Sequence, residues 1–349
     1  MTERFQLLLD WLARQPLLLN EATDTSFSTP VPASSDASFR RYFRVTVTSG
    51  IADPTSYIIM DAPVEHEDSR PFITVSEQLI EMGLQVPKVL AHDLDLGFLL
   101  LTDLGNITYL SVLEEATESK ADQLYQDALS ALVRLQTNGQ SAAEQLPVYD
   151  RALLETEMNL FPDWLIGTHL QGSIGKLERQ NWLSVQTLLQ RSAMAQPQVY
   201  VHRDYHSRNL MVTEQDNPGV LDFQDAVKGA LTYDAVSLLR DCYIAWPAEQ
   251  VKEWQRSYFL QLCSVNLTAK DEWQGFQKSM DWMGIQRHLK AAGIFARLNH
   301  RDGKDGYLND IPQTLDYIVE VGSQYSEMTD LVRLVEDKVL PHTLILSSR

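Results

Sequence analysis

Three oxygen-bearing side chains in the middle of the chain have the types and the spacing that phosphoryl transfer requires. Residues 201–212 read VHRDYHSRNLMV, which contains H-R-D-x-x-x-x-N, and the segment VLDFQD follows shortly after. A protein that transfers a phosphoryl group must orient an acceptor hydroxyl and hold magnesium against the phosphates. The pattern predicts that Asp204 orients or accepts the hydroxyl proton. It also predicts that Asn209 and Asp222 coordinate the metal, because magnesium prefers hard oxygen ligands.

The residues between these side chains indicate how they could meet. Segments 210–213 and 219–221 read as two short strands around an Asp-Asn-Pro-Gly turn. A hairpin of this kind would bring Asn209 and Asp222 side by side. The alternative interpretation is that Asp204 and Asp222 only cap turns.

The flanking elements predict two parts of different character. An amphipathic helix and a loop rich in Ser, Thr and Pro, from Glu21 to Ser35, precede the order strand, strand, helix, strand, strand, and the helix ends at Gly83. The strands are expected to begin near Ser38 and to cover 57–60, 88–92 and 98–102, and helices are expected over 72–82 and 122–137.

We therefore expect an α+β fold of two lobes. Residues 1–104 would form an N-terminal nucleotide-binding lobe with a small antiparallel β-sheet. Residues 105–349 would form a mostly helical C-terminal lobe that carries the catalytic loop and the acceptor site.

Composition excludes several classes of partner. The chain has 349 residues and a formal net charge of −18, so nucleic acid and anionic membrane surfaces would be repelled. No apolar stretch is as long as the ~18 residues of a membrane span. A small-molecule substrate and a cytoplasmic location are the expectation, and the sequence has no signal for an oligomeric state.

A family resemblance supports the assignment of the loop. HRDYHSRNLMV followed by VLDFQDAVKGALTYDAVSLLRD resembles the core of the aminoglycoside phosphotransferase and choline kinase-like superfamily over roughly residues 30 to 260. The resemblance implies the two-lobed protein-kinase-like fold, ATP and Mg²⁺ as cofactors, Asp204 as the catalytic aspartate, and Asn209 and Asp222 as metal ligands. It also implies a structural role for Asp234, which would tie the catalytic loop from a helix N-terminus. His202 is expected to support the same loop, and for His206 a role in the site and a role in packing are both open.

The resemblance also places the nucleotide. The segment FLLLTDLG matches the family's hinge, so the adenine edge is expected to meet backbone groups near Thr102 and Leu104; an ordinary buried strand and turn would read nearly the same. The lysine that normally grips the phosphates is replaced by Met60. Another cation is then expected from the first strand, with Arg41 as the first choice and Arg40 as the second, although an arginine on an exposed strand is the plainer interpretation.

A closer resemblance narrows the acceptor. SDASFRRYFRV, YIIMDAPVEHEDSRPF, LFPDWLIGTHL and GIFARLNHRDGKDGYLNDIP are similar to segments of the bacterial sugar kinases that phosphorylate the anomeric hydroxyl of N-acetylmuramate and N-acetylglucosamine in cell-wall recycling. Arg297, Asn299 and Arg301 would then hydrogen-bond a lactyl carboxylate and sugar hydroxyls, whereas solvated helix charge is the alternative. Two rival functions remain: an aminoglycoside- or choline-like kinase with a cationic acceptor, and a catalytically inactive nucleotide-binding protein.

Overall fold

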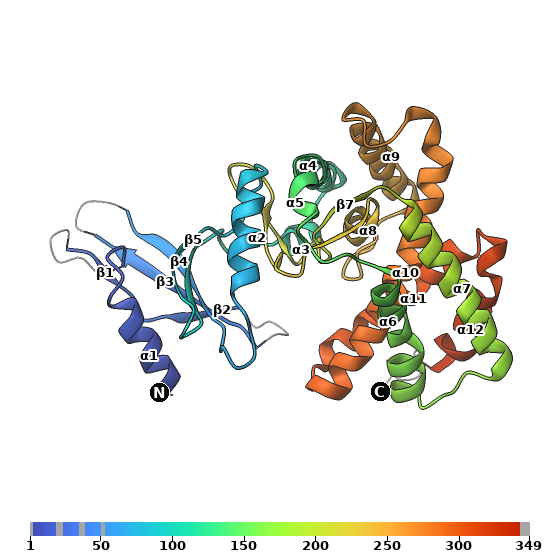
Figure 1. Cartoon of the computed structure of the whole chain (residues 1–349), viewed down its shortest axis with the longest axis horizontal. Coiled ribbons are helices and arrows are strands. Elements are labelled where there is room, and N and C mark those ends of the chain that lie inside the picture. The colour runs from blue at the N-terminus through green and yellow to red at the C-terminus, as the bar shows by residue number, and fades with distance from the viewer. Residues whose placement is uncertain (1–2, 19–23, 35–38, 50–52, 343–349) are drawn as a thin grey trace. The chain divides into compact units, whose positions relative to one another are not determined.

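The chain divides into two compact units in a computed structural model, which describes residues 3–18, 24–34, 39–49 and 53–342 (Figure 1). Unit 1 comprises Met1–Asn106 and Met211–Asp225, and unit 2 comprises Ile107–Leu210 and Ala226–Arg349. Unit 1 is therefore completed by a segment from the second half of the chain.

Unit 1 is built on an antiparallel sheet in the strand order β1-β3-β4-β6-β5, and β2 also pairs with β3. Arg41 lies opposite Asp61 and Tyr42 opposite Met60 in the β3–β4 pair. The four strands expected from the sequence are confirmed. The strands are β1 Ser26–Phe27, β2 Val31–Ser34, β3 Arg41–Thr48, β4 Thr55–Asp61, β5 Val89–Asp93 and β6 Phe98–Thr102.

The prediction of a loop from Glu21 to Ser35 was wrong within residues 24–34, where β1 and β2 lie; its two ends, 21–23 and 35, are outside the described residues. Both strands pair with the outer edge of β3, and the register shifts between Pro32 and Ser34. Proline cannot donate a ladder hydrogen bond, so it is tolerated in strands mainly at such edges. The Ser-, Thr- and Pro-rich composition therefore concealed a short edge pairing.

One face of the sheet is covered by helix α1, Glu3–Leu12. A cluster of buried apolar side chains joins the helix to β3, β4 and β6, and Trp11 lies 5.7 Å from Phe98 between ring centroids. Helix α2, Arg70–Glu81, ends before Gly83, whose φ of 81° is the left-handed conformation that the sequence predicts. The strands β8, Leu210–Met211, and β9, Gly219–Val220, form the expected two-stranded sheet.

Unit 2 is mostly helical, with one antiparallel pair of strands, β7 and β10, in its described residues. Its long helix α10 contacts α6, α7, α8 and α11 (Figure 1). The strands are β7 Gln198–Val201 and β10 Val227–Ala230, and the helices are α3 Tyr109–Leu113, α4 Glu118–Asn138, α5 Gln140–Ala143, α6 Arg151–Leu160, the π-helix η2 Phe161–His169, α7 Lys176–Ala195, α8 Tyr233–Leu239, α9 Ala248–Ser264, the 3₁₀ helix η3 Lys270–Glu272, α10 Trp273–Asp302, the 3₁₀ helix η4 Asp305–Asp310, α11 Ile311–Gly322, the 3₁₀ helix η5 Ser326–Met328 and α12 Thr329–Lys338.

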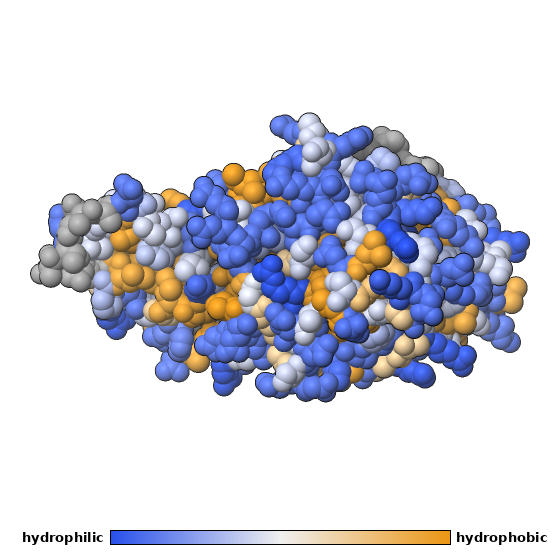
Figure 2. Space-filling model, turned by 90° about the horizontal axis from the view of Figure 1, so that it is seen from above, coloured by the Kyte–Doolittle hydropathy of each residue, from blue (hydrophilic) through white to orange (hydrophobic). Residues whose placement is uncertain are grey.

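Hydrophilic side chains make up most of the face drawn in Figure 2, in keeping with the acidic composition. Among the helices of the described residues, none has both the length and the apolar content needed to cross a bilayer.

Candidate active site

The loop that carries Asp204 follows β7 and is fixed by hydrogen bonds within unit 2. The carboxylate of Asp234, in the first turn of α8, accepts hydrogen bonds from the backbone N–H groups of His202 (2.7 Å) and Arg203 (2.9 Å). Asp204 N–H donates to Nδ1 of His202 (3.2 Å), and Nδ2 of Asn209 donates to the Asp204 carbonyl oxygen (3.0 Å). These contacts hold Arg203 at φ 79°, a conformation that costs a non-glycine residue free energy.

The Asp204 carboxyl is half-buried and stays ionised. Burial alone would raise its pKa, but the positive charge of Lys290, together with the interactions with His206 and Arg203, outweighs burial and holds the pKa below the ordinary value for aspartate. An ionised carboxylate at neutral pH can orient a hydroxyl and accept its proton.

A buried carboxylate, Glu157 of α6, balances the two cations beside Asp204. It forms ion pairs with Arg203 and with Lys290 (3.3 Å), and Tyr149 donates a short hydrogen bond to it. Burial would raise the Glu157 pKa, but Lys290 and Arg203 lower it overall. Lys290 also donates to the Tyr233 hydroxyl (3.0 Å); burial opposes its charge, yet its pKa is raised overall by Tyr233 and Glu157. Lys290 therefore remains a cation close to the catalytic loop.

His206 lies buried in the same loop with its ring at the edge of Tyr243, at 5.2 Å between centroids. Within the described part of the chain, its buried Nδ1 atom has no hydrogen-bond partner. Burial lowers the His206 pKa although Asp241 and Asp204 oppose the shift, so the imidazole is neutral at pH 7. The contacts are compatible with packing and with a role in the site.

Asp222 belongs to unit 1, where it follows β9 with φ 60°. Its Oδ1 atom accepts a hydrogen bond from Nε2 of Gln224 (2.7 Å). The next residue, Phe223, is fully buried and packs against Phe72 of α2, at 4.7 Å between ring centroids. A packed aromatic side chain thus fixes the backbone that carries the carboxylate.

The predicted hinge follows β6 in unit 1. The Thr102 N–H donates to the carbonyl of Lys88 (3.0 Å), and the Thr102 hydroxyl accepts from the Lys88 N–H (2.9 Å). The Leu104 side chain packs close to Gly219: a Cβ atom added to Gly219 would lie 2.9 Å from Leu104 Cδ1. The Thr102 N–H is thus already used in a hydrogen bond to Lys88.

The arginines of the first strand differ in their surroundings. Arg41 pairs with Asp61, which also accepts from Arg4 of α1 (2.8 Å), so the Arg41 side chain is engaged on the face that α1 covers. Arg40 forms an ion pair with Glu67 (2.9 Å), and its side chain is 9% exposed. The fully buried Met60 leaves no lysine at the usual position.

The polar residues near the C-terminal end of α10 also separate into two kinds. Arg301 is exposed and makes two hydrogen bonds to Asp302, at 2.8 and 2.9 Å. Arg297 has its buried Nε atom without a partner among the described residues, and burial, followed by the charge of Arg301, lowers its pKa. Asn299 is half-buried on the same helix. Arg297 is therefore the arginine of this segment whose charge is least compensated.

Sequence reasoning missed the residues that surround the catalytic loop. Glu157, with its partner Lys290, contacts Arg203 of the loop, and Asp241 contacts Ser207 of the same loop. Glu67 pairs with Arg40, a candidate for phosphate binding. Each of these four residues lies far in sequence from the group that it contacts. A lysine within the otherwise apolar stretch 289–296 of α10 was the one available signal, since a buried lysine requires a partner.

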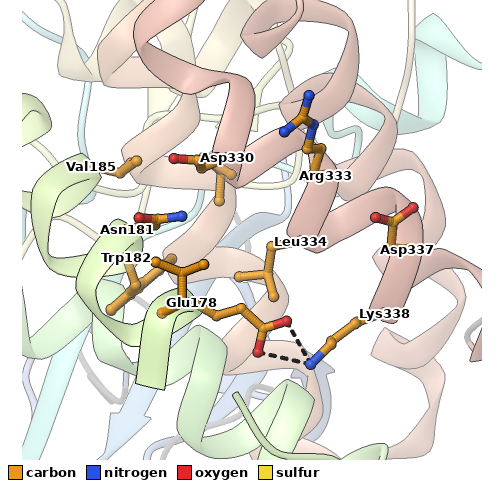
Figure 3. Close-up of a pocket in the computed structure, with 11 residues that line it drawn as sticks. Glu178, Asn181, Trp182, Val185, Asp330, Arg333, Leu334, Asp337 and Lys338 are labelled. Atoms are coloured by element: carbon orange, nitrogen blue, oxygen red, sulfur yellow. Dashed lines mark hydrogen bonds and ion pairs between the residues drawn. The ribbon is translucent and has the colours of Figure 1, made fainter. Parts of the chain in front are cut away.

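A pocket of unit 2 lies between α7 and α12 (Figure 3), and it is lined by residues from 177–185 and 330–338. Its rim carries the ion pair between Glu178 and Lys338 (2.6 Å), and Trp182 and Leu334 form part of its apolar lining. None of the residues that line it belongs to the predicted site.

The fold and the catalytic loop define a phosphotransferase. A family model described as "Phosphotransferase enzyme family" matches residues 29–276, and the chain belongs to this family. It is 43% identical over 340 residues to an N-acetylmuramate/N-acetylglucosamine kinase of Pseudomonas putida, with 96% of each chain covered. It is 44% identical over 305 residues to the enzyme of the same name from Pseudomonas aeruginosa, with 87% of each covered.

The fold prediction is also confirmed by a solved structure. The ethanolamine kinase of Plasmodium vivax matches with a TM-score of 0.64 at 12% identity, covering 97% of this chain and 92% of that one. The chain therefore has the protein-kinase-like α+β fold.

Proposed function

We propose that this enzyme transfers the γ-phosphoryl group of ATP to the anomeric hydroxyl of N-acetylmuramate or N-acetylglucosamine. The observation that carries the proposal is the ionised Asp204, fixed in its loop by Asp234 and Asn209 and kept charged by Lys290. The names of the similar kinases supply the acceptor. Because ATP and the recycled sugars meet in the cytoplasm, we infer that the enzyme works there.

Asn209 and Asp222 fit a magnesium ion by the chemistry of their donors. Asn209 uses its amide nitrogen within the loop, so the amide oxygen is the atom suited to a cation, and Asp222 adds a carboxylate. Asn209 directly precedes β8, and Asp222 follows β9; their shared ligand role is proposed from the sequence motif. When bound, the ion would neutralise charge on the transferred phosphoryl group.

For the nucleotide, the contacts in unit 1 favour Leu104 over Thr102 at the hinge, because the Thr102 N–H is already used by Lys88. Among the candidate cations, Arg40 with Glu67 is an arginine–carboxylate pair that could take the place of the missing lysine–glutamate pair. Arg41 is instead engaged by Asp61. We infer that Arg40 contributes more to ATP binding than Arg41.

For the acceptor, the Arg297 guanidinium, whose buried Nε has no hydrogen-bond partner among the described residues, favours an anionic sugar acid over the cationic acceptor of an aminoglycoside- or choline-like kinase. The intact Asp204, Asn209 and Asp222 argue against an inactive nucleotide-binding protein. Arg301 and Asn299 remain secondary candidates on the same helix.

The decisive experiment is phosphate transfer from labelled ATP to each sugar, with the linkage of the product determined by NMR. Asp204→Asn keeps the shape of the side chain and removes the proton acceptor, so kcat should fall on the order of 100-fold or more. Asp316→Asn, on the exposed side of α11, is the control and should stay within about 2-fold of the wild-type kcat, as expected of a surface change. Full activity of Asp204→Asn, or a wild-type enzyme that labels neither sugar, would exclude the proposed function.

A further inference from the structure

Arg208 directly precedes Asn209 in the loop that carries Asp204. The family resemblance and the sequence motif give roles to Asp204 and Asn209, but none to Arg208. Its guanidinium carbon lies 3.7 Å from the ring centroid of Tyr243 and 5.5 Å from that of Tyr307. The side chain is exposed, and among the described residues it forms no ion pair and donates no hydrogen bond. A guanidinium stacked on an aromatic face keeps its in-plane donors available to a ligand.

A single buried carboxylate positions this arginine. Asp241 accepts from both the N–H (2.9 Å) and the hydroxyl (2.6 Å) of Ser207, the residue before Arg208. The other oxygen of Asp241 accepts from the Tyr243 N–H (3.0 Å). Asp241 thus joins Ser207, the neighbour of Arg208, to the backbone of Tyr243, whose ring lies under the guanidinium. These bonds position Arg208 in the absence of a ligand.

The surroundings of Arg208 form an aromatic wall within unit 2. Phe295 of α10 lies 6.1 Å from Tyr243 and 5.7 Å from Tyr307 between ring centroids. Asp310 is within electrostatic range of Arg208: burial raises its pKa, and Arg208 opposes that rise. The two charges form no ion pair among the described contacts, so the arginine is not neutralised by a direct partner.

An aromatic wall with an arginine that makes no ion pair among the described contacts suits a sugar ring that carries a carboxylate. The two sugars of the proposed function differ in this respect, because N-acetylmuramate is N-acetylglucosamine with an added lactyl ether and its carboxylate. Arg208 and Asp204 lie four residues apart in one loop of unit 2, and this is the observation that connects Arg208 with the proposed acceptor. A planar guanidinium can bind a carboxylate through two parallel hydrogen bonds.

We propose that Arg208 binds the lactyl carboxylate and thereby determines the preference for N-acetylmuramate over N-acetylglucosamine; this inference depends on the proposed function. Arg208 is a binding residue in this view, whereas Asp241 positions it. The triphosphate of ATP is the competing ligand, and the experiment separates the two.

The test compares kcat/KM for both sugars at saturating ATP in wild type and Arg208→Gln. A charge-assisted pair of hydrogen bonds is lost only with the acid, so kcat/KM for N-acetylmuramate should fall about 10- to 100-fold. The value for N-acetylglucosamine should stay within about 3-fold, because this sugar has no group for the guanidinium to bind. Arg208→Lys keeps the charge without the planar fork and should give an intermediate loss.

Arg256→Gln is a matched control, because Arg256 is also exposed and lies over aromatic rings, 4.7 Å from Trp273 and 5.4 Å from Phe259. It should leave both sugars unaffected. A third acceptor, 3-O-methyl-N-acetylglucosamine, has the ether without the carboxylate and should be insensitive to Arg208→Gln.

The outcomes separate the inference from the function on which it rests. If Arg208→Gln lowers kcat/KM equally for all three acceptors and raises KM for ATP, Arg208 serves the nucleotide, and the inference is wrong while the kinase assignment stands. If wild type phosphorylates N-acetylglucosamine alone, the inference is likewise overturned. If wild type phosphorylates neither sugar, the proposed function fails and the inference fails with it.

Discussion

The charge state of Asp204 is set by a lysine that comes from a helix much later in the chain. Lys290 is buried on α10, and its positive charge is among the causes that hold the Asp204 pKa down. Glu157 pairs with the same lysine and keeps it cationic. An opposite charge nearby favours the ionised form of a carboxyl, so the protein can retain an ionised carboxylate in a half-buried position.

Removing this lysine should change the pH dependence of catalysis. In Lys290→Met the largest charge that lowers the Asp204 pKa is lost, so the pKa should rise. Because Asp204 must be ionised to accept a proton, the acid limb of the kcat profile should move to higher pH, by about one pH unit or more if the lost interaction is worth ~1.4 kcal/mol. The measurement is kcat at saturating substrates from pH 8 down to about pH 3, over the range in which both proteins stay folded, because the acid limb of an aspartate lies at acidic pH.

Lys278→Met provides the comparison, since Lys278 is a half-exposed lysine earlier on α10 that pairs with Glu327 (2.9 Å). Its profile should match that of wild type. An unchanged acid limb in Lys290→Met would show that Lys290 does not control Asp204.

The two kinds of site residue differ in how far sequence alone could predict them. The roles of Asp204, Asn209 and Asp222 could be proposed from the sequence, because phosphoryl transfer requires fixed residue types at short spacing in one segment. Lys290 and Glu157 were not, because they reach the loop through packing between helices. Arg208 was visible in the motif, but the role proposed for it depends on Tyr243 and Asp241, which only the fold brings near it.

At the scale of elements, helix α10 connects the catalytic loop to the candidate acceptor region. Lys290 and Arg297 lie two turns apart on it, and between them Gly293 packs against the backbone of Leu160 at the end of α6. A Cβ atom at Gly293 would lie 2.6 Å from the Leu160 Cβ, which is closer than packed atoms approach. The absence of a side chain therefore sets how near α10 lies to α6.

Two substitutions on α10 should have opposite effects for this reason. Gly293→Ala should lower the free energy of unfolding by about 1–3 kcal/mol, because the added methyl group must push the helices apart. Gly275→Ala, on the same helix, meets open space and should raise it by up to about 1 kcal/mol through helix propensity. Urea unfolding of both variants checks the pair, and a Gly293→Ala protein as stable as Gly275→Ala would contradict the close packing.

The elements that the sequence failed to predict share a physical cause. β1 and β2 are two- and four-residue edge strands, and the π-helix η2 differs from an α-helix only in the spacing of its backbone hydrogen bonds. The long periodic segments, such as α2 and α4, were predictable because burial of one face imposes a regular apolar pattern. A strand of two or four residues has too few positions to show a regular alternation of apolar and polar residues in the sequence.

At the scale of the whole molecule, the two units are not independent along the chain. Unit 1 contains the segment Met211–Asp225, so its folding requires residues made after much of unit 2. Val220 N–H donates to the Gln85 carbonyl (2.7 Å), and Phe223 packs on Phe72, so the late segment is joined to the early one by both backbone and side chain. No local pattern in residues 1–106 indicates that unit 1 is completed by a later segment.

Phe223→Ala tests this joining of distant segments. Phe223 is fully buried, and truncation of a buried phenylalanine costs about 3–5 kcal/mol. The loss should destabilise unit 1, so amide hydrogen exchange should accelerate in α2 around Phe72, which is distant in sequence from the substitution. Leu260→Ala, at a 48% exposed position of α9, should change the stability by less than about 0.5 kcal/mol and leave exchange in α2 unaltered. Equal exchange rates in α2 for wild type and Phe223→Ala would mean that the early part of unit 1 holds its structure without the late segment.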